Sequence, residues 1–264
     1  MAATEDDLAL ALELADVADA ITLARFRAAD LVVETKPDLT PVTEADKAVE
    51  RTLRDRLASV RPHDAVMGEE YGSSGEGAGD GRRWIVDPID GTANYVRGIP
   101  VWATLLALQE GGQVTVGVAS APALGRRWWA VRGAGAFATD GLADEPRPLR
   151  VSGVSALEDA QLCISDSAGW EERGRLDCVL NLSRRCWRTR GFGDFWIYML
   201  VAEGVADVAC EAVVSLWDLA APQVIVEEAG GTFTDLGGVP TAEGGDALAT
   251  NGLLHEEALA IVRR

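Results

Sequence analysis

The chain has 264 residues, of which 48% are hydrophobic, enough for one large domain or two closely packed halves. Its 24 basic and 42 acidic residues give a formal net charge of −18, and such a surface repels nucleic acid and anionic lipid. It would also repel a phosphorylated molecule, unless a bound divalent cation reverses the local field. We therefore expect neither nucleic acid nor a membrane as a partner.

Histidine is scarce, and this limits the chemistry that the chain can use. We expect the only two histidines, His63 and His255, to be solvated surface residues. A Ser-His-Asp triad and a zinc site with several imidazoles are therefore disfavoured. If the chain is a metal-dependent hydrolase, oxygen atoms must bind its metal, which indicates Mg²⁺ or a similar hard ion.

Two further features bear on the compartment. The four cysteines lack Cys-x-x-Cys spacing, so we expect them to be reduced, mostly buried and structural. The N-terminal residues are acidic and lack the basic start of a signal peptide, and no apolar run is long enough to cross a bilayer. The cytoplasm is the expected location.

The first 150 residues predict helices followed by strands. Apolar residues spaced three and four apart predict an amphipathic helix within 5–29, followed by a loop over 34–46. Thr43 then opens a second helix, with Asp46 three residues on in a capping-box pattern. Period-two and apolar runs predict the strands that follow, at 65–70, 84–87, 103–108, 114–119 and 126–137.

After residue 150 the pattern changes to alternating strands and helices. A helix is expected to begin at Asp218 and end at Gly230. The other elements expected are strands at 161–165, 206–212 and 247–251 and helices near 170–182, 194–203 and the C-terminus. This order predicts a mixed α/β layered fold whose halves, 1–150 and 151–264, share a cleft.

Four apolar runs in the chain end in acidic residues: VTEAD (42–46), GEE (68–70), VDPID (86–90) and SLWD (215–218). Each acid also has a structural interpretation, because Asp46 and Asp218 could cap helices and Glu69 and Glu70 could form a solvated turn. Ligand sites favour the edges where such strand and helix ends converge. Four such ends in a chain with little histidine favour one common oxygen-rich site.

The stretch VDPIDGT (86–92) has the chemistry of a metal and phosphate site. Two ions about 3.5–4 Å apart can clamp the attacking and leaving oxygens of a phosphoryl transfer. Asp87 is placed to bridge them, with Asp90 and the carbonyl of Ile89 as further ligands. Gly91 lets the backbone approach a ligand closely, and Gly91 and Thr92 open a short helix whose N–H groups can hold a phosphate.

VDPIDGT, GEE, VTEAD with the upstream Lys36, and WDLAAPQVIVEEAGG together resemble the inositol monophosphatase family of Mg²⁺-dependent, lithium-sensitive phosphatases. The resemblance covers most of the chain, in the family's order. It implies an α/β (α+β) fold, a layered α-β-α-β-α sandwich of the inositol monophosphatase / fructose-1,6-bisphosphatase type. It also implies a homodimer that uses two or three Mg²⁺ ions, for which Mn²⁺ substitutes.

The resemblance implies a metal-ligand role for five residues. Glu70, Asp87 and the carbonyl of Ile89 would hold the first ion. Asp87, Asp90 and Asp218 would hold the second. Glu70 would also orient a third, loosely bound ion.

The resemblance also implies the catalytic roles. Asp46 and Thr92 would polarise the attacking water, together with Glu70 at the third ion. The amides of Gly91 and Thr92 would take the phosphate. Lys36, in a mobile loop, would approach the metal site late.

Two stretches, NYVRGIPVWATLLAL (94–108) and RGFGDFWIYMLVAEG (190–204), resemble the branch of this family that acts on histidinol phosphate. That substrate carries an ammonium and an imidazole, so its site should offer carboxylates and an aromatic face. Asp194, Phe195 and Glu211 are the residues expected there. The alternative is structural, with Asp194 capping a helix and Glu211 ending an edge strand.

Other functions stay open at this point. An inositol-1-phosphate or fructose-1,6-bisphosphate phosphatase is an alternative, although a neutral polyol needs no extra acids and a bisphosphate needs a basic pocket. A non-catalytic metal-binding regulator would need no water-activating pair such as Asp46 and Thr92. A cluster of arginines could be a solvated face, a subunit contact or a phosphate attractor: Arg184, Arg185, Arg188 and Arg190.

Overall fold

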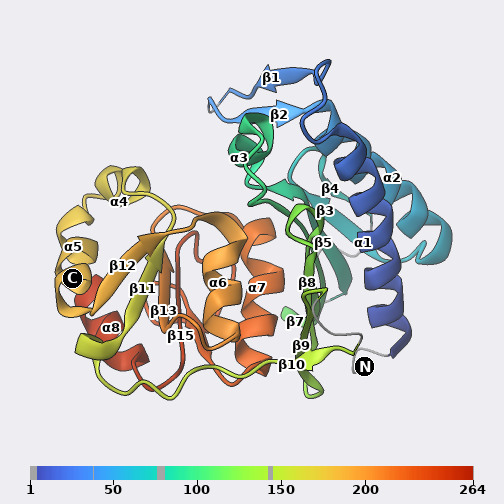
Figure 1. The fold of residues 1–264 in the computed structure, drawn as a ribbon. Helices are drawn as coiled ribbons and strands as arrows, with labels where there is room; N and C mark the ends of the chain where they lie inside the picture. Colours follow the sequence, from blue (N-terminus) through green and yellow to red (C-terminus); the bar gives the residue numbers. More distant parts are fainter. Residues whose placement is uncertain (1–4, 38, 76–80, 142–144, 264) are drawn as a thin grey trace.

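The computed structural model describes residues 5–37, 39–75, 81–141 and 145–263. Its layers run helix, sheet, helix, sheet, helix from one side of the molecule to the other (Figure 1). The predicted α-β-α-β-α sandwich is confirmed. The large sheet is built from strands up to residue 148 and the small sheet from strands after residue 160, so the proposed boundary near 150 falls between them. Whether 1–150 and 151–264 are separate domains stays a prediction.

The outer layer beside the large sheet consists of α1 (Glu5–Arg25) and α2 (Glu44–Val60). Leu14, Val49 and Leu53 of these helices are fully buried against Trp84 and its neighbours on the sheet. α2 begins at the predicted capping box, in which Thr43 Oγ1 accepts from the amide of Asp46 and the Asp46 carboxylate accepts from the amide of Thr43. The box fixes the start of α2 and the direction of the Asp46 side chain.

The segment predicted as a loop over 34–46 contains a hairpin instead. β1 (Val33–Thr35) and β2 (Pro41–Thr43) pair antiparallel and stand apart from the two main sheets (Figure 1). This hairpin could not be predicted from the sequence, because three-residue strands are too short to show an alternating pattern. Its turn carries Lys36.

The large sheet has eight strands in the order β10-β9-β8-β7-β6-β5-β3-β4. β3 runs parallel to β5, and the other neighbours pair antiparallel. A short helix, α3 (Thr92–Arg97), follows β5. The strands are β3 (Ala65–Gly68), β4 (Gly72–Ser74), β5 (Arg82–Asp90), β6 (Ala103–Glu110), β7 (Gln113–Ala121), β8 (Arg126–Val131), β9 (Gly135–Thr139) and β10 (Arg147–Pro148).

The middle layer consists of α6 (Asp194–Ala202) and α7 (Leu216–Glu228), packed between the two sheets (Figure 1). α7 crosses the large sheet closely at Gly117 of β7. A Cβ there would lie 2.5 Å from Val224 Cγ1 and 2.8 Å from the carbonyl oxygen of Ala221. Only glycine therefore permits this approach, which sets how near the start of α7 comes to the end of β5.

The small sheet has five strands in the order β12-β11-β13-β15-β14, with β12, β11 and β13 parallel. Outer helices cover its other face, as Figure 1 shows. The remaining elements are β11 (Gln161–Ile164), α4 (Ala168–Glu172), α5 (Leu176–Arg185), β12 (Arg188–Gly191), β13 (Val208–Glu211), β14 (Thr232–Thr234), β15 (Ala247–Thr250), α8 (His255–Val262) and two 3₁₀ turns, η1 (Pro122–Leu124) and η2 (Leu157–Asp159).

Three expectations for the second half need correction. The helix predicted over 170–182 is divided into α4 and α5 near Gly174, which has a φ of +66°. α7 begins at Leu216, with Ser215 as N-cap and Asp218 as the third helical residue. His255 is not solvated: its ring is 3% exposed and lies between the hydroxyls of Thr234 and Thr250, at 3.1 and 3.2 Å.

Several smaller expectations were tested as well. His63 is exposed, as predicted, and three of the four cysteines are buried. Within the described ranges, no helix is both long and apolar enough to cross a membrane. In the arginine cluster, Arg185 pairs with Glu257 and Arg188 stacks over Trp187, so these two interact on the outer surface of the same chain.

Candidate active site

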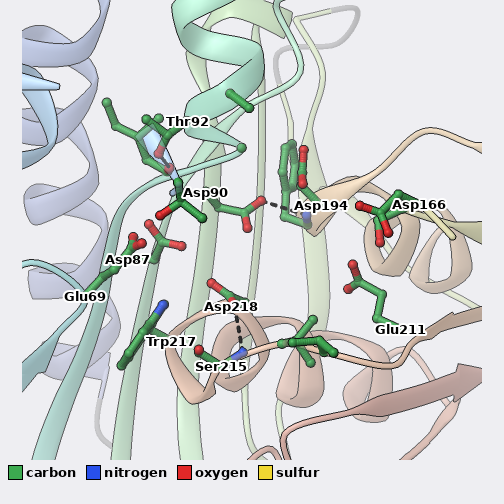
Figure 2. A pocket seen from close by; sticks show the side chains of 18 of the residues that line it. Glu69, Asp87, Asp90, Thr92, Asp166, Asp194, Glu211, Ser215, Trp217 and Asp218 are labelled. Atoms are coloured by element: carbon green, nitrogen blue, oxygen red, sulfur yellow. Dashed lines mark hydrogen bonds between the residues drawn. The ribbon is translucent and has the colours of Figure 1, made fainter. Parts of the chain in front are cut away.

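A cavity of about 480 Å³ opens where the ends of β5, β13 and the starts of α3, α6 and α7 converge (Figure 2). Its lining includes Trp217, Tyr198 and Ser165, and no described lining residue is basic. This composition suits a cation rather than a bare anion. The acids that line it are Glu69, Asp87, Asp90, Asp166, Asp194, Glu211 and Asp218.

Asp87 and Asp90 face the same cavity because β5 carries a bulge. Successive strand residues alternate between the two faces of a sheet, so residues three apart normally point in opposite directions. Asp87 pairs with Leu105 and Asp90 with Ala103, so β5 has one more residue than β6 between these pairs. The extra residue returns Asp90 to the face of Asp87, which is a common use of a bulge beside a ligand site.

Asp87, Asp90 and Asp218 form a compact cluster whose ligand oxygens all lie within 4.8 Å of one another. One oxygen of Asp87 is buried and has no hydrogen-bond partner in the described part of the chain. The capping box of α7 orients Asp218, because its Oδ2 accepts from the amide of Ser215 at 2.8 Å. The Asp218 carboxyl also shares a hydrogen bond with Asp87.

Burial raises the pKa of all three carboxyls in this cluster. The pKa of Asp87 and of Asp90 lies well above its usual range, first because of burial and then because of neighbouring acids. Burial also raises the pKa of Asp218 to about 6. Buried carboxylates this close are costly unless a cation compensates them. The orphaned oxygen and the all-oxygen donor set fit a hard divalent cation.

The structure brings Glu69, rather than the predicted Glu70, to this cluster. Glu69 lines the cavity and its charge contributes to the raised pKa of Asp87 (Figure 2). β3 runs parallel to β5 with Gly68 opposite Val86, so the next residue, Glu69, lies beside Asp87. Glu70 is not among the described residues that line the cavity. Glu69 is therefore better placed than the predicted Glu70 to act as a ligand, and the ligand role itself stays a prediction.

Lys36 already lies at the edge of the site. From the turn of the β1–β2 hairpin its Nζ contacts Glu69 Oε1 at 2.7 Å and Glu70 Oε1 at 2.6 Å. The hairpin is therefore docked against the acidic turn in this structure. A late approach from a mobile loop, as the resemblance implied, stays a prediction.

Asp46 and Thr92 are 46 positions apart in the sequence but lie in contact in the structure, as predicted. Thr92 Oγ1 lies 3.1 Å from Asp46 Oδ1 and 2.8 Å from the carbonyl oxygen of Ile89. The second oxygen of Asp46 accepts from the amide and hydroxyl of Thr43, at 2.8 and 2.5 Å. Burial raises the pKa of Asp46 despite these bonds. The pair is held in place by these bonds, and Thr92 lines the cavity that also contains the acidic cluster.

Gly91 occupies a position that no other residue could take without strain. Its φ is +81°, in the left-handed region that favours glycine. A Cβ there would lie 3.0 Å from Asp194 Oδ2 and 3.1 Å from the carbonyl oxygen of Val101. The chain therefore turns tightly into α3, and Gly91 and Thr92 line the same cavity as Asp87 and Asp90.

Asp194 and Glu211 lie in the same cavity, across from Glu69 (Figure 2). Asp194 accepts from Asn94 Nδ2 at 2.9 Å and has the unusual φ of +49° for a non-glycine residue. Burial and the charge of Asp166 raise its pKa to about 6. Burial raises the pKa of Glu211 to about 8, although Tyr198 donates to it at 2.6 Å.

Phe195 is among the residues that line the cavity, but little of it is exposed there. The residue is 1% exposed, and its ring packs edge-on against Trp128 in the core between the sheets. Its amide donates to Asp90 Oδ2 at 2.7 Å. An aromatic face for the substrate at Phe195 stays a prediction.

Sequence reasoning missed Asp166, which extends the acidic lining. Its Oδ1 accepts from the amides of Ala168 and Gly169, and the residue lines an adjoining cavity of about 270 Å³ as well. A signal was present: Asp166 follows the apolar strand β11, which runs parallel to β13 and therefore ends beside Glu211. None of the four clustered arginines lies among the described lining residues.

The chain was compared with known proteins. A model of the inositol monophosphatase family matches residues 4–264. The chain is 57% identical over 263 residues to a histidinol-phosphatase of Streptomyces coelicolor, covering 98% of this chain and 97% of that protein. It is 56% identical over 257 residues to a histidinol-phosphatase of Mycobacterium tuberculosis, covering 97% of both.

The fold has a close structural counterpart. The chain superposes with a TM-score of 0.85 and 31% identity on an inositol monophosphatase from Zymomonas mobilis, covering 100% of both chains. The chain therefore belongs to the inositol monophosphatase family. It is accordingly a phosphomonoester hydrolase.

Proposed function

We propose that this protein hydrolyses L-histidinol phosphate to L-histidinol and inorganic phosphate, a step of histidine biosynthesis, and that it requires Mg²⁺. The observation that carries the proposal is a second group of acids, Asp166, Asp194 and Glu211, in the same cavity as the metal cluster. A leaving group with an ammonium and an imidazole matches this lining through charge-assisted hydrogen bonds. The two relatives at 56–57% identity carry the same activity in their names.

The metal ligands follow from the site with one revision. Glu69, Asp87 and the carbonyl of Ile89 would hold one ion, and Asp87, Asp90 and Asp218 a second. Glu70 remains a candidate for orienting a third, loosely held ion. When bound, Mg²⁺ polarises phosphoryl oxygens and lowers the pKa of water. Mn²⁺ should substitute because it accepts the same oxygen donors.

The remaining catalytic roles belong to residues around the cluster. Asp46 and Thr92 would orient the attacking water, and Asp46, with its raised pKa, would accept its proton. The amides of Gly91 and Thr92 would bind the phosphoryl oxygens at the start of α3. Lys36 would neutralise Glu69 and Glu70 when no ion does so.

The raised carboxyl pKa values predict how Mg²⁺ stabilisation depends on pH. Above about pH 4 an unfolded chain has released these protons, whereas the folded metal-free cluster still holds them, with the pKa of Asp218 at about 6. The retained protons stabilise the folded protein at low pH, and this stabilisation is lost as the pH rises through the pKa values of the folded carboxyls. Mg²⁺ competes with the same protons, so it should raise Tm more at pH 8 than at pH 5.5.

Thermal unfolding at both pH values, in EDTA and in excess Mg²⁺, measures this difference. A Mg²⁺-induced increase in Tm that is larger at pH 5.5 would contradict the assignment of these carboxylates as ligands.

Two alternative substrates are less well matched by the cavity. Inositol-1-phosphate has a neutral leaving group, which leaves Asp194 and Glu211 without a partner. Fructose-1,6-bisphosphate brings a second phosphate into a lining with no basic residue among those described. A non-catalytic regulator would not need the bonded pair of Asp46 and Thr92.

A phosphate-release assay on the three substrates tests the proposal. With Mg²⁺ present, histidinol phosphate should show the highest kcat/KM, and exhaustive EDTA treatment should abolish turnover until Mg²⁺ or Mn²⁺ is restored. Lithium should inhibit. Full turnover after EDTA treatment would exclude the metal mechanism, and a preference for inositol-1-phosphate would transfer the assignment to that substrate.

We also propose that the protein works in the cytoplasm as a homodimer. Support for the compartment comes from the buried thiols of Cys163, Cys186 and Cys210, which suit a reducing environment. Support for the dimer comes from the family resemblance, and light scattering on the purified protein would measure it.

A further inference from the structure

α2 carries three charged residues in a row on one face: Asp46, Glu50 and Arg54, each four positions apart. Asp46 belongs to the pair with Thr92 at the active site. Glu50 does not line the cavity, yet its side chain is 0% exposed. A carboxylate that is fully removed from water needs strong compensation, and it is rarely placed so without a purpose.

Three donors converge on Glu50. Its Oε2 accepts from the amide of Glu70 at 2.7 Å, and its Oε1 accepts from the amide of Tyr71 at 3.1 Å. Arg54 Nε donates to Oε1 at 2.7 Å. The two amides belong to the turn between β3 and β4, which is the turn that presents Glu69 to the metal cluster.

Arg54 also bonds to the residues that follow this turn, in β4. It donates to Ser74 Oγ at 2.7 Å and to the carbonyl oxygen of Gly72. Glu50 and Arg54 therefore hold the turn from residue 70 to residue 74 against the rigid body of α2. Neither residue is a cavity-lining group, so their effect on the site must pass through this backbone.

Gly68 shows how closely the carboxylate fits under the turn. A Cβ on Gly68 would lie 2.1 Å from Glu50 Oε1 and 2.3 Å from its Cδ. The space that a side chain would need is taken by the Glu50 carboxylate. Glu69 lies between this contact and the bonded amide of Glu70, while its own amide donates to Val86 at 3.3 Å. The backbone on both sides of Glu69 is thereby fixed.

We propose that Glu50, braced by Arg54, is a positioning residue that sets the geometry in which Glu69 binds the divalent cation with Asp87. One helix then controls two parts of the site, since α2 also holds Asp46 against Thr92. The inference rests on the proposed metal-dependent function. Partners of this kind, which orient a ligand without touching the ion, typically contribute 10- to 100-fold to metal affinity.

The test is direct binding of Mn²⁺, followed by electron paramagnetic resonance of the free ion, together with Tm. Glu50→Gln keeps the size of the side chain but offers an amide donor to one of the two backbone N–H groups. It should weaken Mn²⁺ binding about 10- to 100-fold and raise the Mg²⁺ concentration for half-maximal activity by a similar factor. At saturating Mg²⁺ its kcat should approach the wild-type value.

Asp55→Asn is the matched control, because Asp55 lies on the exposed face of the same helix. It should bind Mn²⁺ like the wild type. Arg54→Gln is the second variant, in case Glu50→Gln does not fold; it leaves both amide bonds but removes the brace, and should weaken Mn²⁺ binding in the same direction.

A lowered Tm with unchanged Mn²⁺ affinity in Glu50→Gln would show a purely structural role and overturn the inference. If Glu50→Gln does not fold, wild-type affinity in Arg54→Gln would overturn it as well. These results would leave the proposed function standing, because the wild type still binds the ion. Absence of Mn²⁺ binding by the wild type itself would instead overturn the proposed metal site, and the inference with it.

Discussion

Asp87→Asn should reduce kcat by at least about 10²–10³-fold, because the loss of a single preorganised transition-state stabiliser already costs that much. Asp87 is the acid that both proposed ions share, and its orphaned buried oxygen has no other partner among the described residues. An amide keeps the shape of the side chain but loses the charge that draws a cation into a buried site.

The same substitution should stabilise the metal-free protein. Asp87 is surrounded by Glu69, Asp90 and Asp218, whose charges all raise its pKa. Because the folded metal-free protein must keep a proton on Asp87 that the unfolded chain has released, an amide at this position removes that cost of folding. We therefore expect a higher Tm than wild type in EDTA and a smaller increase when Mg²⁺ is added.

Activity and Tm should be measured on the same preparation, with Asp55→Asn as an exposed control. A folded Asp87→Asn protein within about tenfold of wild-type kcat would show that another residue bridges the ions. A loss of activity accompanied by a lower Tm in EDTA would indicate damage to the fold, and would not support the ligand role.

The elements that the sequence predicted correctly have signals confined to one element. The capping box at Thr43 and the long periodic helices depend on residues three or four apart. Some of the elements missed depend on pairing with strands that are distant in the sequence. β12, for example, has the sequence Arg-Thr-Arg-Gly and is a strand only because it pairs with β11. Tertiary pairing here overrides local propensity.

The same distinction explains the site. The Asp87–Asp90 pair was predictable because both acids stand in one short motif, Asp-Pro-Ile-Asp-Gly. The bulge that brings them to the same face of β5 appears only in the register with β6. Glu69 and Glu70 are adjacent and chemically alike, so only the register of β3 against β5 separates them. His255 was misplaced because its burial depends on Thr234 and other residues outside its own helix.

Asp194→Asn should lower kcat/KM for histidinol phosphate about 10- to 150-fold. A charge-assisted hydrogen bond is worth roughly 1.5–3 kcal/mol, and this range converts to that factor. With a pKa of about 6, Asp194 is mostly ionised at pH 7.5 and can pair with the cationic leaving group. A small ester whose organic group carries no positive charge, such as p-nitrophenyl phosphate, makes no such pair and should be hydrolysed nearly as before.

The comparison of two substrates on one variant separates recognition from structure. Asp194 also accepts from Asn94 and its Oδ2 would lie 3.0 Å from a Cβ on Gly91, so damage to the phosphate turn is the competing explanation. Such damage would lower kcat/KM equally for both substrates, because both place a phosphate on that turn. A selective loss on histidinol phosphate requires that Asp194 contacts the leaving group. An equal loss of kcat/KM on both substrates would show that Asp194 has a structural role. Specificity for histidinol phosphate would then have to come from Glu211 and Asp166.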